Sequence, residues 1–454
     1  MKDILEAVDS QRNDALEDLK TFLRIPSVST DPQYEEDIRR CAEQVAEGLR
    51  DSGFAAEIHP TQRHPVVVAE RVEDPALHTV LIYGHYDVQP PDPLDRWETD
   101  PFDPAVRDGY IFARGAHDNK GQIFCHLKAV EAFHRVRGRL PVNVKFLIEG
   151  EEEIGSPNLD GFMRENADRL KADYAVVSDT AHFAEGVPAI MYGLRGLSYL
   201  EVILTGPDRD LHSGGYGGTV DNPVNVLVRL LASLMDEDGG VAIPGFYDDV
   251  LPLEDWEREA FAALPLDEAD YRGSLGVPAL FGEKGYSTLE RKWARPTLDV
   301  NGIYGGYQGP GSKTVIPCRA GAKVSMRLVP NQDPEKINDL FESTVRERLP
   351  KTVRLEVSRY WGSRPVLVDA ASPAVEAGRK ALQKGFGRPP VLVREGGTIP
   401  VVASLQDVLG LDSLLVPFGG PDDRTHSPNE RMPLENVHRG ILTACHLLDE
   451  LSRI

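Results

Sequence analysis

Five polar segments of the chain carry the residue types that bind metal ions or move protons in hydrolytic enzymes. They span residues 83–87, 114–121, 148–156, 176–179 and 424–430, and four of them follow short apolar runs. The histidines and carboxylates in these segments suit Zn²⁺ or Mn²⁺. The number of ligands fits two ions that share one carboxylate, and paired ions of this kind activate water for hydrolysis.

The first segment places a histidine and a carboxylate two residues apart. His85 and Asp87 follow the apolar run 79–83, so both fall at the carboxyl end of a predicted buried strand. Open α/β sheets place ligand sites at that edge, and residues two apart on an extended chain point to the same side. A metal-binding histidine usually has its second nitrogen held by a carboxylate or carbonyl group. The pair fits a ligand with its support; taken alone, it also fits two ordinary surface residues.

Three consecutive glutamates, Glu151, Glu152 and Glu153, follow the predicted strand 142–148. Like charges this close raise one another's pKa unless a cation neutralises them. The run also fits a solvated acidic turn, just as the glycine-flanked segment 114–121 fits an ordinary helix start. The recurrence of polar segments after apolar strands favours a shared site over five unrelated turns.

The apolar pattern around these segments predicts strands that alternate with helices. Helices are predicted over 4–25, 38–49, 122–136, 373–385, 400–409 and 435–452, with a further helix start at Ser156-Pro157. Strands are predicted over 54–58, 66–69, 80–83, 142–148, 174–177, 391–394 and 413–416. This alternation predicts a three-layer α/β/α domain with a mostly parallel sheet.

A different pattern occupies the middle of the chain. Its predicted strands are 197–205, 298–304, 320–328 and 352–360, and its predicted helices are 222–235 and 334–349. The order along the chain is the β-α-β-β-α-β arrangement of ferredoxin-like domains. An acidic insertion, 236–296, is too long for a plain loop and is expected to contain helix. We expect a discontinuous α/β domain, 1–193 and 365–454, interrupted by a second domain, 194–364.

The formal charge at pH 7 is −22, from 72 acidic and 50 basic residues. An excess of this sign repels phosphate backbones and anionic lipids, so we expect neither a nucleic-acid nor a membrane partner. Four scattered cysteines without a CxxC pair argue against a disulfide scaffold and fit a reducing compartment. The N-terminal residues do not form a secretory signal, and no apolar run approaches ~18 residues. We therefore expect a cytoplasmic protein.

An ordered set of motifs extends over nearly the whole chain, from about residue 10 to 450. It comprises GHYDVQP, ARGAHDNKG, EGEEEIGSPNL, VVSDT, YGLRG, DLHSGGYGG, RLVP, REGGTIPV and THSPNER. The set resembles the metallopeptidase family of carnosinase, cytosolic nonspecific dipeptidase, aminoacylase-1, glutamate carboxypeptidase, acetylornithine deacetylase and succinyl-diaminopimelate desuccinylase, and it looks most like the dipeptidase branch. The resemblance implies a di-zinc catalytic domain and an inserted lid domain that forms a homodimer.

The resemblance also implies roles for residues of the catalytic domain. His85 and Asp179 would bind one metal ion, His426 and Glu153 would bind the other, and Asp118 would bridge both. The Asp118–Asn119 peptide bond of such a site is typically cis.

Proton transfer and ligand orientation are also assigned by the resemblance. Glu152 would be the general base and Asp87 would orient His85, while Glu151 receives no role.

The resemblance assigns further residues to substrate binding. His212 would reach the partner subunit's active site and stabilise the oxyanion, and Arg327 would pair with the substrate's carboxylate. Gly396, Gly397 and Thr398 would cradle the same carboxylate with backbone N–H groups. On sequence alone, His212 also fits an ordinary loop histidine, Arg327 a strand-surface arginine, and 396–398 a plain turn.

These implications predict a dipeptidase with two divalent ions per subunit. Zn²⁺ is the expected metal, and Mn²⁺ is the alternative. It would hydrolyse dipeptides that have a free C-terminal carboxylate, with a metal-bridged water activated by Glu152. Deacylation of N-acyl amino acids uses the same chemistry, so the motifs leave that alternative open. A third hypothesis is a metal-binding protein with the same fold and no catalytic activity.

Overall fold

The computed structural model describes residues 1–454, and internal contacts divide them into two units. The first unit comprises Met1–Tyr192, Val368–Val393 and Ser404–Ile454, and the second comprises Gly193–Leu367 and Arg394–Ala403. Segment 394–403, which was expected in the first domain, makes its contacts with the second unit. One of these contacts is the hydrogen bond that the hydroxyl of Thr398 donates to the carbonyl of Arg195 at 2.7 Å.

The first unit is built on a large mixed sheet. Its strands follow the order β1 (Ala55–His59), β2 (Val66–Arg71), β6 (Asn143–Glu149), β3 (Thr79–His85), β7 (Tyr174–Val177), β17 (Ser413–Leu415) and β8 (Ala189–Leu194), and β16 (Val391–Glu395) also pairs with β8. β15 (Val366–Leu367), which belongs to the second unit, pairs with the last two residues of β8. Neighbours among β6, β3, β7 and β17 are parallel, whereas β1, β2, β8 and β15 pair antiparallel. The predicted α/β class is confirmed, with the parallel strands confined to the centre of the sheet.

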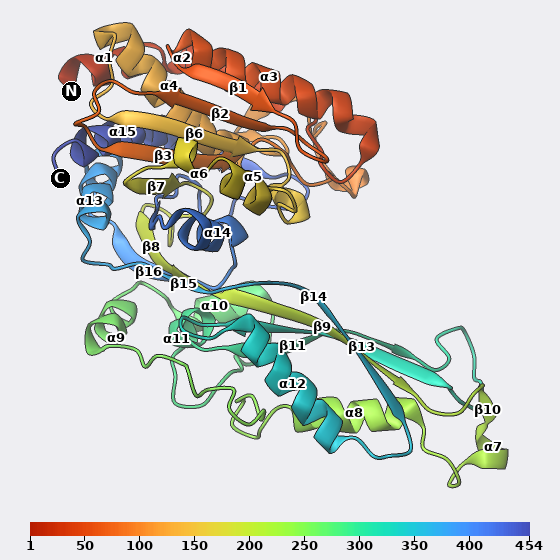
Figure 1. Ribbon diagram of the computed structural model, residues 1–454. Helices are drawn as coiled ribbons and strands as arrows, with labels where there is room; N and C mark the ends of the chain where they lie inside the picture. Colours follow the sequence, from red (N-terminus) through yellow and green to blue (C-terminus); the bar gives the residue numbers. More distant parts are fainter. The chain divides into compact units, whose positions relative to one another are not determined.

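Helices cover both faces of this sheet. One layer contains α1 (Lys2–Ser10), α2 (Arg12–Leu23), α3 (Glu35–Asp51), α4 (Lys120–Arg137), α13 (Pro373–Phe386) and α15 (Leu434–Leu451), which contact one another. The other face carries α5 (Leu159–Glu165) and α6 (Ala167–Leu170) (Figure 1). The chain crosses from β3 to β6 in one direction and from β6 to β7 in the other, so right-handed crossovers place their helices on opposite faces.

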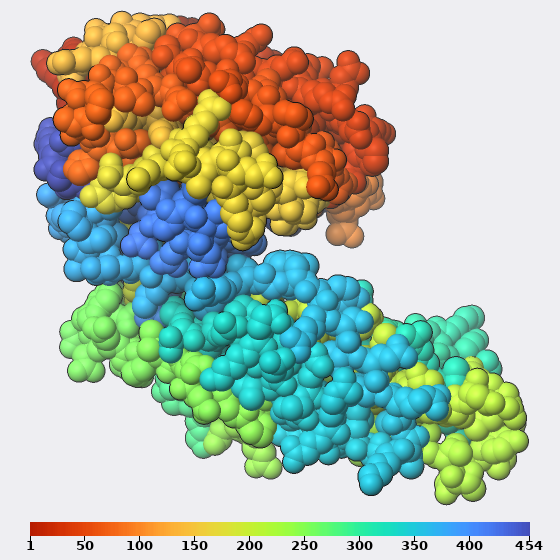
Figure 2. All heavy atoms as spheres, in the orientation of Figure 1, coloured from red at the N-terminus to blue at the C-terminus, as the bar shows by residue number.

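Shorter elements complete the first unit. They are the 3₁₀ helices η1 (Pro32–Tyr34), η2 (Leu94–Arg96) and η3 (Glu152–Ile154), and the antiparallel sheet of β4 (Ala105–Arg107), β5 (Tyr110–Phe112) and β18 (Arg431–Pro433). Helix α14 (Pro400–Leu409) begins in the second unit and ends in the first. In Figure 2 the N-terminal residues, coloured red and orange, cover one outer face of the first unit.

The helix predicted to start at Ser156-Pro157 begins instead at Leu159. Ser156 has φ +50°, the left-handed conformation. Its hydroxyl donates to Oε1 of Glu149 at 2.8 Å, so it does not cap a helix. The Ser-Pro pair therefore lies in a turn after the glutamate run, and this turn is hydrogen-bonded to the last residue of β6.

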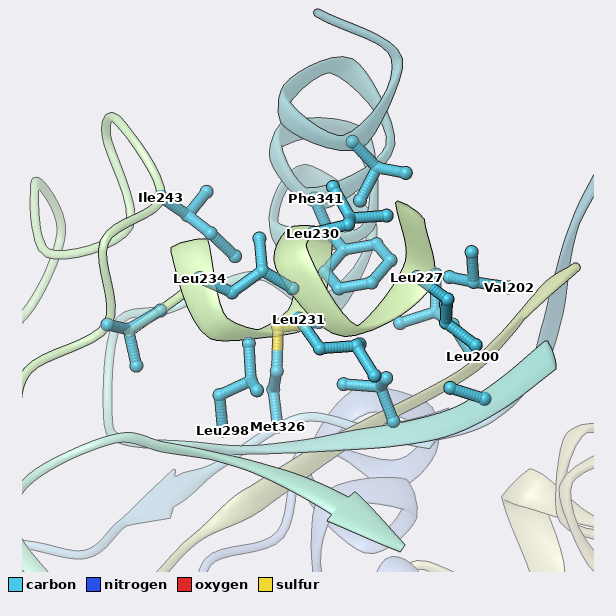
Figure 3. Packing of buried hydrophobic residues seen from close by; sticks show 14 of the residues in the cluster. Leu200, Val202, Leu227, Leu230, Leu231, Leu234, Ile243, Leu298, Met326 and Phe341 are labelled. Atoms are coloured by element: carbon cyan, nitrogen blue, oxygen red, sulfur yellow. The ribbon is translucent and has the colours of Figure 1, made fainter. Parts of the chain in front are cut away.

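The second unit has the predicted β-α-β-β-α-β order. Its elements are β9 (Gly196–Thr205), α8 (Pro223–Ser233), β11 (Thr297–Gly305), β13 (Arg319–Leu328), α12 (Pro334–Arg348) and β14 (Arg354–Ser363), and the antiparallel sheet runs β11-β13-β9-β14. Figure 3 shows Leu227, Leu230 and Leu231 of α8 over the sheet. These leucines pack with Leu200 of β9 and Phe341 of α12 in one buried apolar cluster.

The acidic insertion contains helix, as expected. Its helices are α9 (Asp255–Ala262), α10 (Glu268–Leu275) and α11 (Thr288–Trp293). A short ribbon of β10 (Leu211–His212) and β12 (Val315–Ile316) precedes and follows it, and α7 (Ser213–Tyr216) continues from β10. None of the chain's helices combines the length and apolar character needed to cross a bilayer.

Candidate metal centre

The candidate site lies at the carboxyl edge of the central parallel strands. His85 is the last residue of β3, the glutamate run follows β6, and Asp179 follows β7. Because these strands are parallel, their carboxyl ends meet at the same edge of the sheet. The fourth contributor is Asp118, which lies two residues before the first residue of α4.

The first group of ligand atoms comprises His85, Asp118 and Asp179. Nε2 of His85 lies 3.2 Å from Oδ1 of Asp118 and 3.7 Å from Oδ1 of Asp179. Oε2 of Glu152 lies 4.0 Å from the same nitrogen. Three carboxylates thus converge on one buried imidazole nitrogen, and the predicted general base stands beside the predicted ligands.

The second group comprises Asp118, Glu153 and His426. Nε2 of His426 lies 2.9 Å from Oδ2 of Asp118 and 3.2 Å from Oε2 of Glu153. Asp118 belongs to both groups, and its two oxygens face different histidines. This is the geometry that a carboxylate shared by two metal ions requires. The Asp118–Asn119 peptide bond is cis, as the resemblance implied.

Asp87 supports both sides of the site. Nδ1 of His85 donates to the carbonyl oxygen of Asp87 at 3.1 Å and lies 3.4 Å from its Oδ1. The carboxylate of Asp87 also accepts the backbone N–H groups of Glu152 and Glu153, at 3.2 and 3.1 Å. The residue predicted to orient His85 therefore also fixes the turn that carries the other two groups.

The three glutamates of the run have different surroundings. Glu151 is buried away from the ligand groups, where its Oε1 accepts the hydroxyl of Thr61 and the backbone N–H of His64. It anchors a loop and belongs to neither ligand group. Glu152 and Glu153, held by Asp87, are the two that face the histidines.

Two side chains that donate hydrogen bonds to proposed metal ligands could not be identified from the sequence. The amide of Asn119 donates to Oδ1 of Asp179 at 2.7 Å and to the carbonyl of Ser178 at 2.6 Å. The amide of Gln89 donates to Oε2 of Glu153 at 2.8 Å. Asn119 and Gln89 lie in the DNKG and DVQP motifs, so their position beside acidic residues was the only available signal.

The site concentrates negative charge in a buried place. Burial raises the pKa of Glu152 well above its usual value, and Asp179 adds to the shift. Burial raises the pKa of Glu153 to about 7, with Asp118 adding to it. Hydrogen bonds to Asp118 and Glu153 raise the pKa of His426 to about 10. Acidic groups held this close together favour the binding of a cation at the site.

The residues present fit metal ions. Nε2 of His85 and Oε1 of Glu153 are buried and have no hydrogen-bond partner, a costly state for atoms that do not bind an ion. The donors are imidazole nitrogens and carboxylate oxygens, which suit Zn²⁺ and Mn²⁺. Each group supplies three ligand residues, and Asp118 counts in both.

The residues predicted to bind the substrate's carboxylate lie in the second unit. Nη1 of Arg327 donates to the hydroxyl oxygen of Thr398 at 2.7 Å. The backbone N–H groups of Gly396 and Gly397 both donate to Oε1 of Glu395, at 2.6 and 3.1 Å. The structure therefore brings Arg327 to the 396–398 turn, and that turn already receives a carboxylate oxygen.

His212 is the remaining predicted residue. It is the last residue of β10 and its side chain is exposed. Its Nδ1 accepts the backbone N–H of Gly214 at 2.9 Å, which begins the short helix α7. Within the second unit, no hydrogen bond joins His212 to Arg327 or to the 396–398 turn.

A mixed α/β sheet with two histidine–carboxylate groups that share one aspartate fits a metallohydrolase. Comparison with known proteins specifies the class further. The model of Peptidase family M20/M25/M40 matches residues 81–450, and the chain belongs to this family. It is a hydrolase that acts on peptide bonds. The resemblance read from the motifs is confirmed.

Several relatives match over almost their full length. The chain is 34% identical to the human Beta-Ala-His dipeptidase, over 97% of this chain and 90% of the relative. It is 33% identical to the Cys-Gly metallodipeptidase dug1 of Schizosaccharomyces pombe, over 99% and 98%. The solved structure of the M20 family metallo-carboxypeptidase Sso-CP2 from Sulfolobus solfataricus matches with a TM-score of 0.88 at 34% identity, covering 97% of this chain and 99% of that one.

Proposed function

We propose that this protein is a dipeptidase that hydrolyses the single peptide bond of dipeptides with a free C-terminal carboxylate. The observation that carries the proposal is the pair of ligand groups joined through Asp118, with Oε2 of Glu152 4.0 Å from His85. The names of the relatives, two dipeptidases and a carboxypeptidase, support this substrate class.

In the proposed site His85, Asp118 and Asp179 hold one divalent ion, and Asp118, Glu153 and His426 hold the second. We propose Zn²⁺ as the bound metal, with Mn²⁺ as the ion that the same ligands also suit. When bound, such ions polarise the substrate's carbonyl and lower the pKa of water.

Glu152 performs the proton transfers. Burial raises the pKa of its carboxyl group, and a higher pKa makes the ionised carboxylate a stronger base. It takes a proton from the attacking water and returns it to the nitrogen of the leaving amino acid. Asp87 keeps Glu152 in place through the backbone bond to its N–H.

Recognition of the substrate's carboxylate is assigned to Arg327, Gly396, Gly397 and Thr398. The guanidinium of Arg327 offers a planar fork of donors that matches a carboxylate. The N–H groups of Gly396 and Gly397 already bind one carboxylate oxygen, from Glu395, which supports an anion-binding role for this turn.

We assign the first unit as the catalytic domain and the second as a lid and dimerisation domain of a homodimer. His212 would then stabilise the oxyanion of the partner subunit's active site. Four free cysteines support a cytoplasmic location.

A substrate panel tests the proposal. Hydrolysis rates are measured for dipeptides, for the same dipeptides with an amidated C-terminus, and for N-acetyl amino acids, with Zn²⁺ and with Mn²⁺. We expect cleavage of free dipeptides, and strongly reduced cleavage after amidation because Arg327 loses its anionic partner. Faster hydrolysis of N-acetyl amino acids than of every dipeptide would assign the site to deacylation instead.

A further inference from the structure

A fully buried carboxylate, that of Glu430, holds the segment that carries Asp118. Its Oε1 accepts the backbone N–H groups of His117 and Asp118, at 2.9 and 3.0 Å. Its Oε2 accepts the backbone N–H of Gly115 at 3.0 Å and Nη1 of Arg114 at 2.7 Å. Both Glu430 and Arg114 are at most 1% exposed. One side chain thus binds four donors of a five-residue segment that ends at the shared aspartate.

A second buried carboxylate, that of Asp423, binds the same segment. Oδ2 of Asp423 lies 2.8 Å from Nδ1 of His117, which donates to it. Asp423 precedes His426 by three residues and Glu430 follows it by four. The backbone N–H of Arg431 also donates to the carbonyl of Asp423 at 2.9 Å, which closes the loop between the two acids.

The histidine at the centre of this loop has little support of its own. The side chain of His426 is 56% exposed, and the residue has φ +58°, a left-handed conformation that non-glycine residues rarely adopt. The polar partners of its ring nitrogen Nε2 are the proposed ligands Asp118 and Glu153. The position of His426 relative to Asp118 must therefore come from the contacts of the flanking residues.

We propose that Glu430 and Asp423 act as positioning residues, a clasp that sets the distance between Asp118 and His426 and so fixes the second metal position. The clasp joins the two segments that supply these ligands, at two points on either side of His426. The first position shares Asp118, but its other two ligands are held outside the clasp, since His85 belongs to β3 and the carboxylate of Asp179 accepts the amide of Asn119. The proposal rests on the two-ion site of the proposed function.

The test is a Zn²⁺ titration of the full-length chain carrying Glu430→Gln. All four groups bound by Glu430 are donors, so the amide of glutamine must turn N–H groups toward at least one of them. Supporting residues of metal ligands contribute about 10- to 100-fold to affinity. We expect one of the two Zn²⁺ affinities to fall by at least about tenfold and the other to change much less.

Controls separate the clasp from general damage. Glu450→Gln removes the same charge from a buried glutamate of α15 that pairs with Lys384 and touches no proposed ligand, and it should bind both ions as the unaltered chain does. Asp423→Asn, a milder change on the other side of His426, should weaken the same ion. If Glu430→Gln does not fold, the Zn²⁺ affinities of Asp423→Asn test the proposal instead.

Two results would overturn the proposal. One is unchanged affinity for both ions in folded Glu430→Gln and Asp423→Asn proteins. The other is an equal loss of both ions, together with a lowered melting temperature, which would mean that the two acids serve only the fold. The titration uses no peptide, so a failure to cleave dipeptides cannot be mistaken for a failure of the clasp.

Discussion

Asp118 is the residue on which the site depends most, because its two carboxylate oxygens face different histidines at 3.2 and 2.9 Å. Every other proposed ligand belongs to one group only. Glu152 has a separate position, beside His85 but outside both groups of three. A proton-transferring residue that is not a ligand can be removed without dismantling the metal site.

Replacing Glu152 with alanine therefore tests the general base alone. Loss of a positioned acid–base group lowers turnover by about 10²–10⁴-fold. We expect a fall in kcat of at least that size, with both metal ions retained in elemental analysis. A metal-loaded Glu152→Ala protein with near-normal turnover would remove Glu152 from the mechanism.

Glu149 gives a pH-dependent prediction. Burial raises its pKa to about 8, against about 4.3 for an exposed glutamate. Between these values the folded chain binds a proton that the unfolded chain releases, so this group's contribution to stability falls as pH rises. The contribution is fully present below about pH 4 and lost above about pH 8.

The variant Glu149→Gln should keep the acceptor for Tyr83 and Ser156 and remove this dependence. Urea unfolding of chelator-treated protein between pH 5 and pH 8 measures it. We expect the variant to lose less stability than the unaltered chain across that range. Parallel curves for the two proteins would show that Glu149 is ionised in the folded state.

At the scale of elements, the second unit is held by the apolar face of α8. Leu227 is fully buried in the cluster between α8 and the sheet, whereas the next residue, Val228, is 52% exposed. Figure 3 shows Leu227 directed toward Leu200 and Val202 of β9. Neighbouring positions on one helix thus offer a buried site and an exposed control.

Leu227→Ala should destabilise the second unit by about 2–5 kcal/mol, because it removes buried methyl groups and leaves a cavity. Val228→Ala should change stability by no more than about 0.5 kcal/mol. Chemical denaturation followed by circular dichroism compares them. Equal effects of the two substitutions would contradict the packing of α8.

Strongly periodic elements were predictable from sequence, and contacts between distant segments were not. The strands and helices of the second unit match the predicted ranges to within a few residues, because alternation and helical periodicity are local. The prediction of a single helix over 4–25 was wrong in one respect, because the helix is interrupted at Gln11 and forms α1 and α2. The Ser156-Pro157 helix start failed because Ser156 bonds to Glu149 instead.

The same distinction applies to the site. The ligand types and their place after apolar strands were visible in the sequence, and the motifs supplied the pairing of ligands. The support from Glu430 was not visible, because a buried glutamate in the polar segment 424–430 looks like any solvated acid. Its partners lie more than 300 positions away in the chain, and only the folded structure brings them together.

At the scale of the whole molecule, the chain comprises two units, and the proposed roles divide between them. The metal groups and Glu152 belong to the first unit, while His212, Arg327 and the 396–398 turn belong to the second. The charge of −22 is mostly that of a solvated surface, but Asp118, Glu153 and Asp179 lie together where cations make their proximity tolerable.

The proposed homodimer predicts complementation between inactive chains. Dimers of Glu152→Ala chains lack the base, and dimers of His212→Ala chains lack the oxyanion donor. In a mixed dimer, the site with an intact Glu152 receives an intact His212 from its partner. Random pairing after co-expression should restore about a quarter of normal activity. No activity above that of the separate variants would contradict a role for His212 in the partner's site.

The central claim is that two metal ions, bound through Asp118, make this chain a dipeptidase. The most direct test measures dipeptide hydrolysis against the number of Zn²⁺ ions per chain, after chelation and stepwise reconstitution. We predict no activity in the chelated protein and a maximum reached at two ions per chain. Full activity in protein shown by elemental analysis to contain no metal, or a maximum at one ion, would contradict the claim.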